Sequence, residues 1–346
     1  MPLFEYKPVD QQYYERYLKD FLPGSIIDVH THVYSGSLRT DAEGAKPLPG
    51  RSQRWPSLVA ADNPAEDLRE TYRILFPDKQ VTPVIFGMPS YEYTVENSNA
   101  YIMETARENG WPSLMLVYPE QTADTLNVLL DRGGFRGVKV YLEYAPRYIP
   151  AHEVRIFDFI PHHQLEALNA REAVLMLHIP RPSRLKDPVN VAQMLEIDRR
   201  YPKVKLIIAH IGRAYATEDV GDTLERLKDS RMVFDFSANT NHQVFEEALK
   251  TVGPRRLLFG SDLPITRMRM KRTVEHGAYI NIIPKGLYGD VTGEAHMRET
   301  EGEEAAALSF FLYEEINAMR RACEAVSASR GDINALFYDN AAGIFL

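Results

Sequence analysis

Eight short hydrophobic runs recur along the chain, and each closes on polar or chemically capable residues. The runs are apolar at nearly every position, which is typical of strands that are buried on both faces of a parallel sheet. We therefore predict eight buried parallel strands. They cover residues 26–32, 81–88, 114–118, 135–141, 173–177, 204–209, 232–236 and 257–259.

The segments between these runs carry apolar residues at helical spacing, and several stop at glycine or proline. The helices expected from this pattern cover residues 65–76, 123–130, 163–170, 191–201 and 220–227. Eight strands that alternate with helices in 346 residues predict a closed (β/α)8 TIM barrel of the α/β class. An open doubly wound sheet is the alternative, but no G-x-G-x-x-G motif follows the first strand.

We expect a single domain over residues 1–346, with a barrel core that starts at about residue 25. Four additions surround this core. They are an aromatic-rich helical lead-in over residues 1–23, a long loop over 34–64 after the first strand, an insertion over 263–304 after the eighth strand, and C-terminal helices over 305–346. Loops as long as the one after the first strand are usually functional or disordered.

The first strand ends in His30-Thr31-His32. Side chains two positions apart on a strand point to the same side, so both imidazoles can reach one point in space. Imidazole is a common ligand of zinc and other transition metals. Three more residues of suitable chemistry follow the ends of the fifth, sixth and eighth strands, and these are His178, His210 and Asp262. Because the carboxyl ends of barrel strands share one face, we predict a metal site there.

Several phrases of the chain, taken in this order, resemble the amidohydrolase superfamily. They are IIDVHTHVY, FRGVKVY, AVLMLHIPRP, YPKVKLIIAHIG, RRLLFGSDLP and INALFYDNAAGIF. The resemblance covers roughly residues 25–346 and is greatest to the amidohydrolase-related (amidohydrolase 2) group. That group includes aminocarboxymuconate-semialdehyde decarboxylase, resorcylate-type decarboxylases and pyrone-dicarboxylate lactonase.

The resemblance implies that one divalent metal ion is held by a four-residue set, with zinc as the expected ion and manganese as the alternative. The four residues are His30, His32, His178 and Asp262. Asp262 is also expected to accept the proton of a metal-bound water, and His210 to act beside the metal as an acid, a base or an electrostatic contact.

Lys139, near the end of the fourth strand, leaves the metal count open. Superfamily members with two metals use a carboxylated lysine there as a bridging ligand. The alternative is an uncarboxylated lysine that pairs with Glu143 or contacts the substrate. We predict one metal ion, and two if Lys139 is carboxylated.

Arginines follow several of the strands that carry the predicted ligands. Arg181 and Arg213 come soon after His178 and His210, and Arg267 opens the insertion. Arginine binds carboxylates through two parallel hydrogen bonds, which predicts a small anionic, carboxylate-bearing substrate. Tyr141 at the fourth strand and Trp55 in the long loop are further candidate substrate contacts.

The composition agrees with an enzyme of the cytoplasm. Its net charge of -8 makes nucleic acid an unexpected partner, and the single cysteine, Cys323, rules out an internal disulfide framework. The first residues lack the features of a signal peptide, and no apolar run approaches the roughly 20 residues that span a bilayer. Because members of the related group are often dimers, a homodimer is expected.

The predicted ligand set is compatible with two reactions. The first, which we favour, is metal-dependent hydrolysis of a lactone, amide or similar bond by an activated water. The alternative is non-oxidative decarboxylation of an aromatic or unsaturated carboxylic acid. A metal-binding barrel without catalysis is a third and remote interpretation, because both Asp262 and His210 accompany the ligand set.

Overall fold

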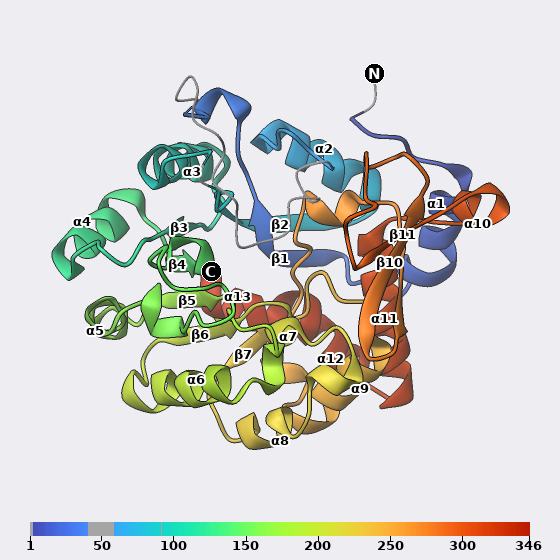
Figure 1. Cartoon of the computed structure of the whole chain (residues 1–346). Helices are drawn as coiled ribbons and strands as arrows, with labels where there is room; N and C mark the ends of the chain where they lie inside the picture. Colours follow the sequence, from blue (N-terminus) through green and yellow to red (C-terminus); the bar gives the residue numbers. More distant parts are fainter. Residues whose placement is uncertain (1–2, 41–58, 91) are drawn as a thin grey trace.

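The computed structural model of the chain describes residues 3–40, 59–90 and 92–346. Its central sheet contains eight parallel strands (Figure 1). The strands are β1 (Ser25–His32), β2 (Gln80–Phe86), β3 (Leu114–Leu116), β4 (Gly137–Val140), β5 (Val174–Leu177), β6 (Lys205–Ile208), β7 (Val233–Asp235) and β8 (Leu257–Leu258). Each lies within or next to one of the predicted runs.

The sheet closes on itself. Strands β3 to β8 pair in sequence order, β1 pairs with β2, and a parallel bridge from Ile85 to Ser113 joins β2 to β3. On the other side, the Val29 amide donates to Phe259 and the Asp262 amide donates to His30, at 3.0 and 2.8 Å. The predicted barrel is therefore confirmed, and an open sheet is excluded.

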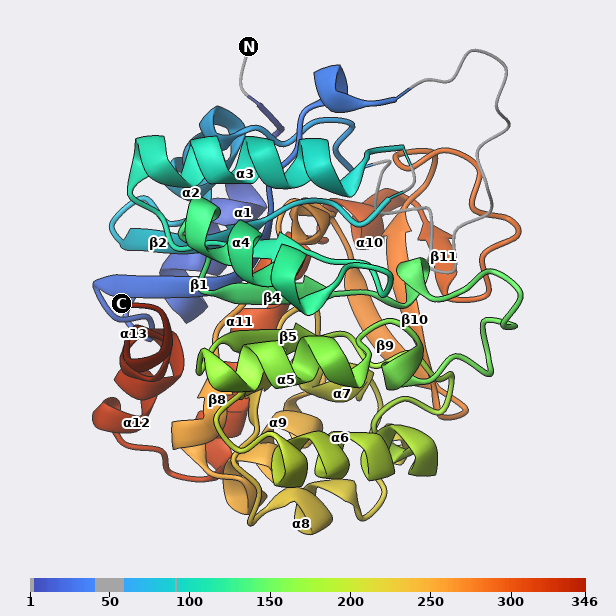
Figure 2. The same ribbon diagram turned by 90° about the vertical axis from the view of Figure 1, so that its left-hand side faces the viewer.

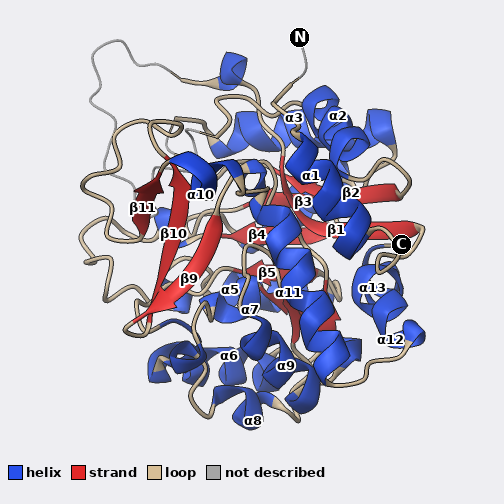
Figure 3. Cartoon of the chain, turned by 90° about the vertical axis from the view of Figure 1, so that its right-hand side faces the viewer, coloured by secondary structure: helices blue, strands red, loops and turns tan. Residues whose placement is uncertain are grey.

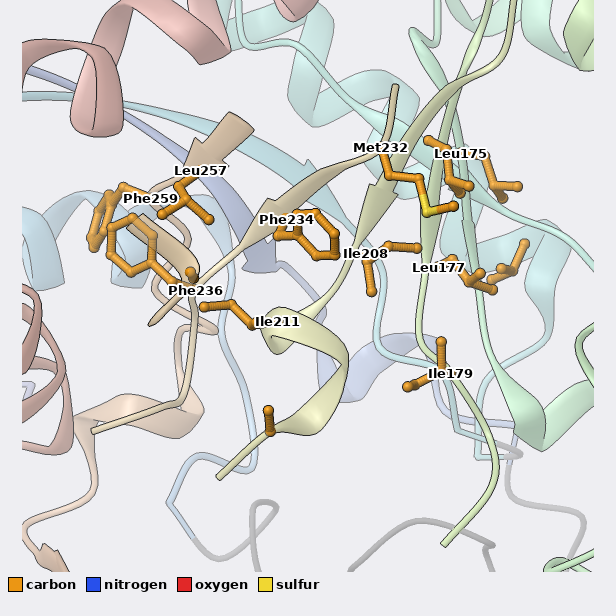
Figure 4. Close-up of a cluster of buried hydrophobic side chains, with 14 of the residues drawn as sticks. Leu175, Leu177, Ile179, Ile208, Ile211, Met232, Phe234, Phe236, Leu257 and Phe259 are labelled. Carbon is orange, nitrogen blue, oxygen red and sulfur yellow. The ribbon is translucent and has the colours of Figure 1, made fainter. Parts of the chain in front are cut away.

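Helices cover the outside of the barrel, and Figure 2 shows α3 to α6 along one side of it. The helices between strands are α2 (Ala65–Leu75), α3 (Val95–Asn109), α4 (Ala123–Gly133), α5 (His162–Ala170), α6 (Pro188–Arg200), the short turn α7 (His210–Arg213), α8 (Thr223–Leu227) and α9 (His242–Thr251). Side chains that point outward from the strands pack under these helices, among them Leu177, Ile208 and Phe234 (Figure 4). A smaller cluster that includes Ile27, Val29 and Phe345 fills the barrel interior.

The insertion after β8 folds into a small sheet beside the barrel (Figure 3). Its strands are β9 (Lys271–Glu275), β10 (Ala278–Pro284) and β11 (Met297–Thr300), in the order β11-β10-β9. His276 and Gly277 form the β9–β10 turn with φ values of 51° and 75°, as a two-residue hairpin turn requires. The sequence analysis predicts where this insertion lies but does not predict its three strands.

The C-terminal segment predicted to be helical over residues 305–346 is interrupted near its start. Helix α10 (Gly302–Ala306) ends before Phe310, and α11 (Phe311–Ala325) begins after it. Phe310 is extended and bridges Arg269, and the Phe311 amide donates to Met268. Pairing with the insertion therefore interrupts the helix. The chain ends in α12 (Arg330–Asn334), a π-helical turn (Ala335–Asp339) and α13 (Asn340–Phe345).

The N-terminal lead-in contains α1 (Pro8–Tyr13) and a π-helical turn (Tyr14–Leu18), as the aromatic spacing predicts. Tyr13 and Tyr14 both pack on Tyr313 of α11. Asp10 forms a buried two-pronged ion pair with Arg269, at 2.8 and 2.7 Å, and so joins the lead-in to the insertion. Among the described helices, none is long and apolar enough to cross a membrane.

Candidate metal centre

A β-bulge places the first two predicted ligands. In the pairing of β1 with β2, the two residues of β1 between Asp28 and Thr31 face the single residue of β2 between Pro83 and Ile85, so one extra residue is accommodated. Val29 and the histidines of the motif can then all face the barrel interior, where strict alternation would turn Val29 and His30 to opposite sides. The bulge therefore allows both histidines to point to the same site.

The Nδ1 atoms of both histidines have protein partners. His30 Nδ1 lies 3.0 Å from Asp235 Oδ2 at the end of β7, and His32 Nδ1 lies 3.0 Å from the Gly87 carbonyl after β2. A carbonyl only accepts hydrogen bonds, so Nδ1 of His32 carries the proton and Nε2 of a neutral ring is left with a lone pair. The carboxylate imposes the same tautomer on His30.

Both Nε2 atoms face Asp262. His32 Nε2 lies 3.3 Å and His30 Nε2 lies 3.5 Å from Asp262 Oδ1, and one ligand atom from each residue falls within 4.8 Å of the others. His30 Nε2 is buried and makes no hydrogen bond within the described chain. His30 Nε2, His32 Nε2 and Asp262 Oδ1 thus converge, each with a lone pair and none with a proton. This donor set fits a divalent cation with nitrogen and oxygen ligands.

The protonation states agree with metal binding. Burial, together with the Lys139 ammonium, lowers the pKa of His30 to about 3, and burial likewise lowers the pKa values of His178 and His210. Burial alone would raise the pKa of Asp262, but the neighbouring histidines hold it below its usual value. Neutral imidazoles and an ionised carboxylate are the forms that ligate metals.

His210 occupies a strained turn at the end of β6. The φ angles of His210, Ile211, Gly212 and Arg213 all lie between 45° and 62°, in the left-handed region. The His210 amide donates to Asp235 Oδ1 at 2.9 Å, and its ring Nδ1 contacts Ser237 Oγ at 2.9 Å. Such strain persists where surrounding contacts hold it, which is common at functional sites. The His210 ring centroid lies 4.7 Å from that of His30.

His178 neighbours both His210 and Tyr141. Its ring centroid is 5.4 Å from His210 and 5.3 Å from Tyr141, on which it stacks. Its Nδ1 atom is buried without a hydrogen-bond partner in the described structure. His178 is not one of the three residues whose ligand atoms converge within 4.8 Å, so its role as a fourth ligand stays a prediction. The Tyr141 hydroxyl lies 3.5 Å from His32 Nε2, which places Tyr141 at the site.

Lys139 points into the same region. It is fully buried, and its Nζ has no hydrogen-bond partner among the described residues. The ammonium lies 4.7 Å from the Tyr141 ring centroid and 5.5 Å from that of Phe86. Burial lowers the pKa of Lys139 to about 8, although Asp235 and Asp262 favour its charge. A buried cation without a hydrogen-bond partner is costly, so an anion beside the Lys139 ammonium would stabilise it.

The predicted arginines have different surroundings. Arg213 donates to the carbonyls of Ile179 and Pro180, and within the described chain it makes no ion pair. Arg181 pairs with Asp187 at 3.2 Å, and Arg267 donates to Thr71 and lies over Phe4. Arg213 lies beside His178, because it donates to the carbonyl of the next residue, Ile179, and its charge adds to burial in lowering the pKa of His178. Trp55 lies outside the described residues.

Asp235 and Ser237 are functional candidates that the sequence reasoning missed. Asp235 Oδ1 and Oδ2 together contact His30, the His210 amide and Ser237. Burial would raise the pKa of Asp235, but His30, His210 and Lys139 together lower it. An acidic residue inside the apolar run over 232–236 was the signal that could have identified it.

Comparison with known proteins decides the family. A family model for amidohydrolases matches residues 27–345. This chain belongs to the amidohydrolase family. The predicted resemblance is confirmed, and an amidohydrolase of this superfamily is a metal-dependent enzyme. Among curated proteins, no match to this amidohydrolase is found.

Solved structures share the amidohydrolase fold. The dihydroxybenzoic acid decarboxylase of Polaromonas sp. JS666, with bound manganese and 2-nitroresorcinol, is 16% identical with a TM-score of 0.55, over 93% of this chain and 97% of that one. A proposed 2-pyrone-4,6-dicarboxylic acid hydrolase from Pseudomonas putida is 17% identical with a TM-score of 0.53, over 94% and 98% of the chains. A 2,6-dihydroxybenzoate decarboxylase in complex with 2,6-dihydroxybenzoate is 14% identical with a TM-score of 0.53, over 93% and 99%.

Proposed function

We propose that this amidohydrolase uses one divalent metal ion, zinc or manganese, to hydrolyse a lactone, amide or related bond in a small carboxylate-bearing substrate. The observation that carries the proposal is the convergence of His30 Nε2, His32 Nε2 and Asp262 Oδ1. His178 is proposed as the fourth ligand.

A divalent metal held by these residues supplies a Lewis acid that polarises a carbonyl oxygen and lowers the pKa of water toward about 7. Asp262 would accept the proton of the attacking water through Oδ2, because Oδ1 is the oxygen that faces the two histidines. His210 Nδ1 contacts the Ser237 carbonyl and hydroxyl, so Nε2 of the neutral ring carries a lone pair. We propose that His210 first accepts a proton at Nε2, and that it then stabilises the developing oxyanion or protonates the leaving group as an imidazolium.

Two cationic side chains support an anionic substrate. Lys139 provides a buried ammonium, and Arg213 provides a partly exposed guanidinium without a carboxylate partner among the described residues. A substrate carboxylate would compensate both charges and would orient the scissile bond toward Asp262.

Decarboxylation is the second candidate, and the buried Lys139 ammonium beside Tyr141 favours it. The Lys139 ammonium would draw a carboxylate in among the rings of Tyr141 and Phe86, where little water solvates it. Departure of neutral carbon dioxide needs no such solvation. A proton from solvent, relayed through His210, would then form the C–H bond that replaces the broken C–C bond. Two of the similar structures described above are named as decarboxylases of dihydroxybenzoates.

A substrate panel separates the two reactions. Metal-loaded protein is incubated with lactones, amides and aromatic carboxylates, and acid release and carbon dioxide release are followed in parallel. Hydrolysis predicts acid without carbon dioxide, and decarboxylation predicts the reverse. The H32A variant is the control, since it should abolish either activity. Full turnover by D262N would instead support the non-catalytic interpretation of the metal site.

A further inference from the structure

Helix α11 buries a carboxyl group against the turn that follows β7. Glu315 is the only acidic residue among the side chains that this described helix buries, and its own exposure is 0%. Glu315 Oε2 accepts a hydrogen bond from the Ala238 amide at 2.7 Å, while Oε1 has no hydrogen-bond partner among the described residues. Because burying a carboxyl group is costly, the contact with Ala238 is the part of the structure that its presence supports.

The Ala238 amide belongs to the same peptide group as the Ser237 carbonyl. That carbonyl oxygen lies 3.2 Å from His210 Nδ1, and the Ser237 hydroxyl lies 2.9 Å from the same nitrogen. The C=O and N–H of a trans peptide point in opposite directions, so His210 and Glu315 lie on opposite sides of one peptide group. Hydrogen bonds in such a chain polarise one another, so an acceptor on the Ala238 amide makes the Ser237 carbonyl a stronger acceptor for His210.

The turn that contains this peptide group is strained. Ala238 has a φ of 50°, in the left-handed region that an alanine adopts only where surrounding contacts hold it. Arg272 Nη1, from β9, donates to the Ala238 carbonyl at 2.7 Å, so both backbone polar groups of Ala238 are bound by side chains. Of these two contacts, the one with Glu315 acts directly on the peptide group that His210 contacts.

We infer that Glu315 is a positioning residue for His210, which it holds in the Nδ1–H tautomer through the Ser237–Ala238 peptide. The inference rests on the proposed function, because the Nε2 lone pair that this tautomer leaves matters only if His210 acts as the base. Glu315 needs no charge for this role, since the oxygen of a neutral acid also accepts a hydrogen bond. Burial raises the pKa of Glu315, and the nearby Asp28 and Asp235 add to the rise.

The test is heteronuclear NMR of zinc-loaded protein whose histidines carry a nitrogen isotope, because ring nitrogen shifts report which nitrogen bears the proton. The signals of His210 are assigned by their loss in H210Q. Wild-type protein should show His210 protonated at Nδ1. E315L removes the acceptor of the Ala238 amide, and the ratio of the Nδ1–H to the Nε2–H tautomer should fall by about 5- to 10-fold. E315Q retains an oxygen acceptor and should restore the wild-type ratio.

Two further variants make the test specific. E315D keeps the carboxyl group but withdraws it by one methylene, so it should lower the ratio by less than E315L and decides the test if E315L does not fold. Glu314, the preceding residue of α11, interacts with Tyr13 of the lead-in, so E314L is the matched control and should leave the His210 signals unchanged. All variants should retain the wild-type zinc content.

The outcomes separate this inference from the function on which it rests, because the NMR readout needs no substrate. A wild-type tautomer ratio in both E315D and E315L overturns the inference, as does protonation of His210 at Nε2 in the wild type. An equal shift in E314L, or a shift in E315Q as large as that in E315L, also overturns it. If the substrate panel shows no hydrolysis while the tautomer responds to Glu315, the proposed function fails and the positioning of His210 stands.

Discussion

Asp235 Oδ2 lies 3.0 Å from His30 Nδ1, and both side chains are fully buried. The contact joins the end of β7 to the first strand and leaves His30 Nε2 free to face Asp262. Asp235 Oδ1 also accepts a hydrogen bond from the His210 amide. One carboxylate therefore orients a predicted metal ligand and the predicted acid or base together, a role typical of residues that support metal ligands from behind.

Replacing Asp235 by asparagine should weaken metal binding by about 10- to 100-fold, because the amide does not impose the same tautomer on His30. Competition with a chromogenic chelator measures the affinity. D187N is the control, since Asp187 is also buried but caps α6 and pairs with Arg181. Wild-type affinity in D235N would show that the contact is dispensable.

Gly260 provides a steric test of the same ring. A Cβ added at Gly260 would meet the His30 Cβ at 2.7 Å, closer than real Cβ contacts allow, whereas nothing lies within 4 Å of a Cβ at Gly24. G260A should displace His30 and reduce turnover by about 100-fold. G24A should leave turnover unchanged. Equal activities of G260A and G24A would contradict the predicted clash between a Cβ at position 260 and His30.

Replacing Lys139 by methionine separates stability from function. Because the ammonium is buried without a hydrogen-bond partner in the described structure, K139M should unfold at the same or a higher denaturant concentration. Turnover should fall by about 100-fold or more if the ammonium holds the substrate. The exposed Lys205 on β6 allows K205M as a control. Retained turnover in K139M would remove Lys139 from the site.

The ion pair of Asp10 with Arg269 should contribute strongly to stability. D10A leaves a buried guanidinium without its partner and should lower the free energy of unfolding by about 3 to 5 kcal/mol. E301Q removes the exposed partner of Lys285 and should cost at most about 1 kcal/mol. Equilibrium denaturation measures both. Similar small losses would show that the lead-in is not anchored by this pair.

The strands, the barrel and the convergence of His30, His32 and Asp262 were predictable from the sequence. Short hydrophobic runs indicate buried parallel strands, and the carboxyl ends of such strands meet on one face of a barrel. The bulge near Val29 was not, since it depends on the register between β1 and β2. The contact of Asp235 with His30 was missed because it joins β7 to β1, and the sequence alone does not show which residues of distant strands lie next to each other. The break before Phe311 arises from pairing with the insertion, which no local pattern indicates.

The most direct test of the metal centre is anomalous diffraction from crystals of protein purified without chelators. We expect one anomalous peak per chain, bounded by His30 Nε2, His32 Nε2 and the Asp262 carboxylate, with His178 as the fourth ligand. Two peaks bridged by Lys139, or no peak between these residues, would contradict the single-metal centre proposed for this amidohydrolase.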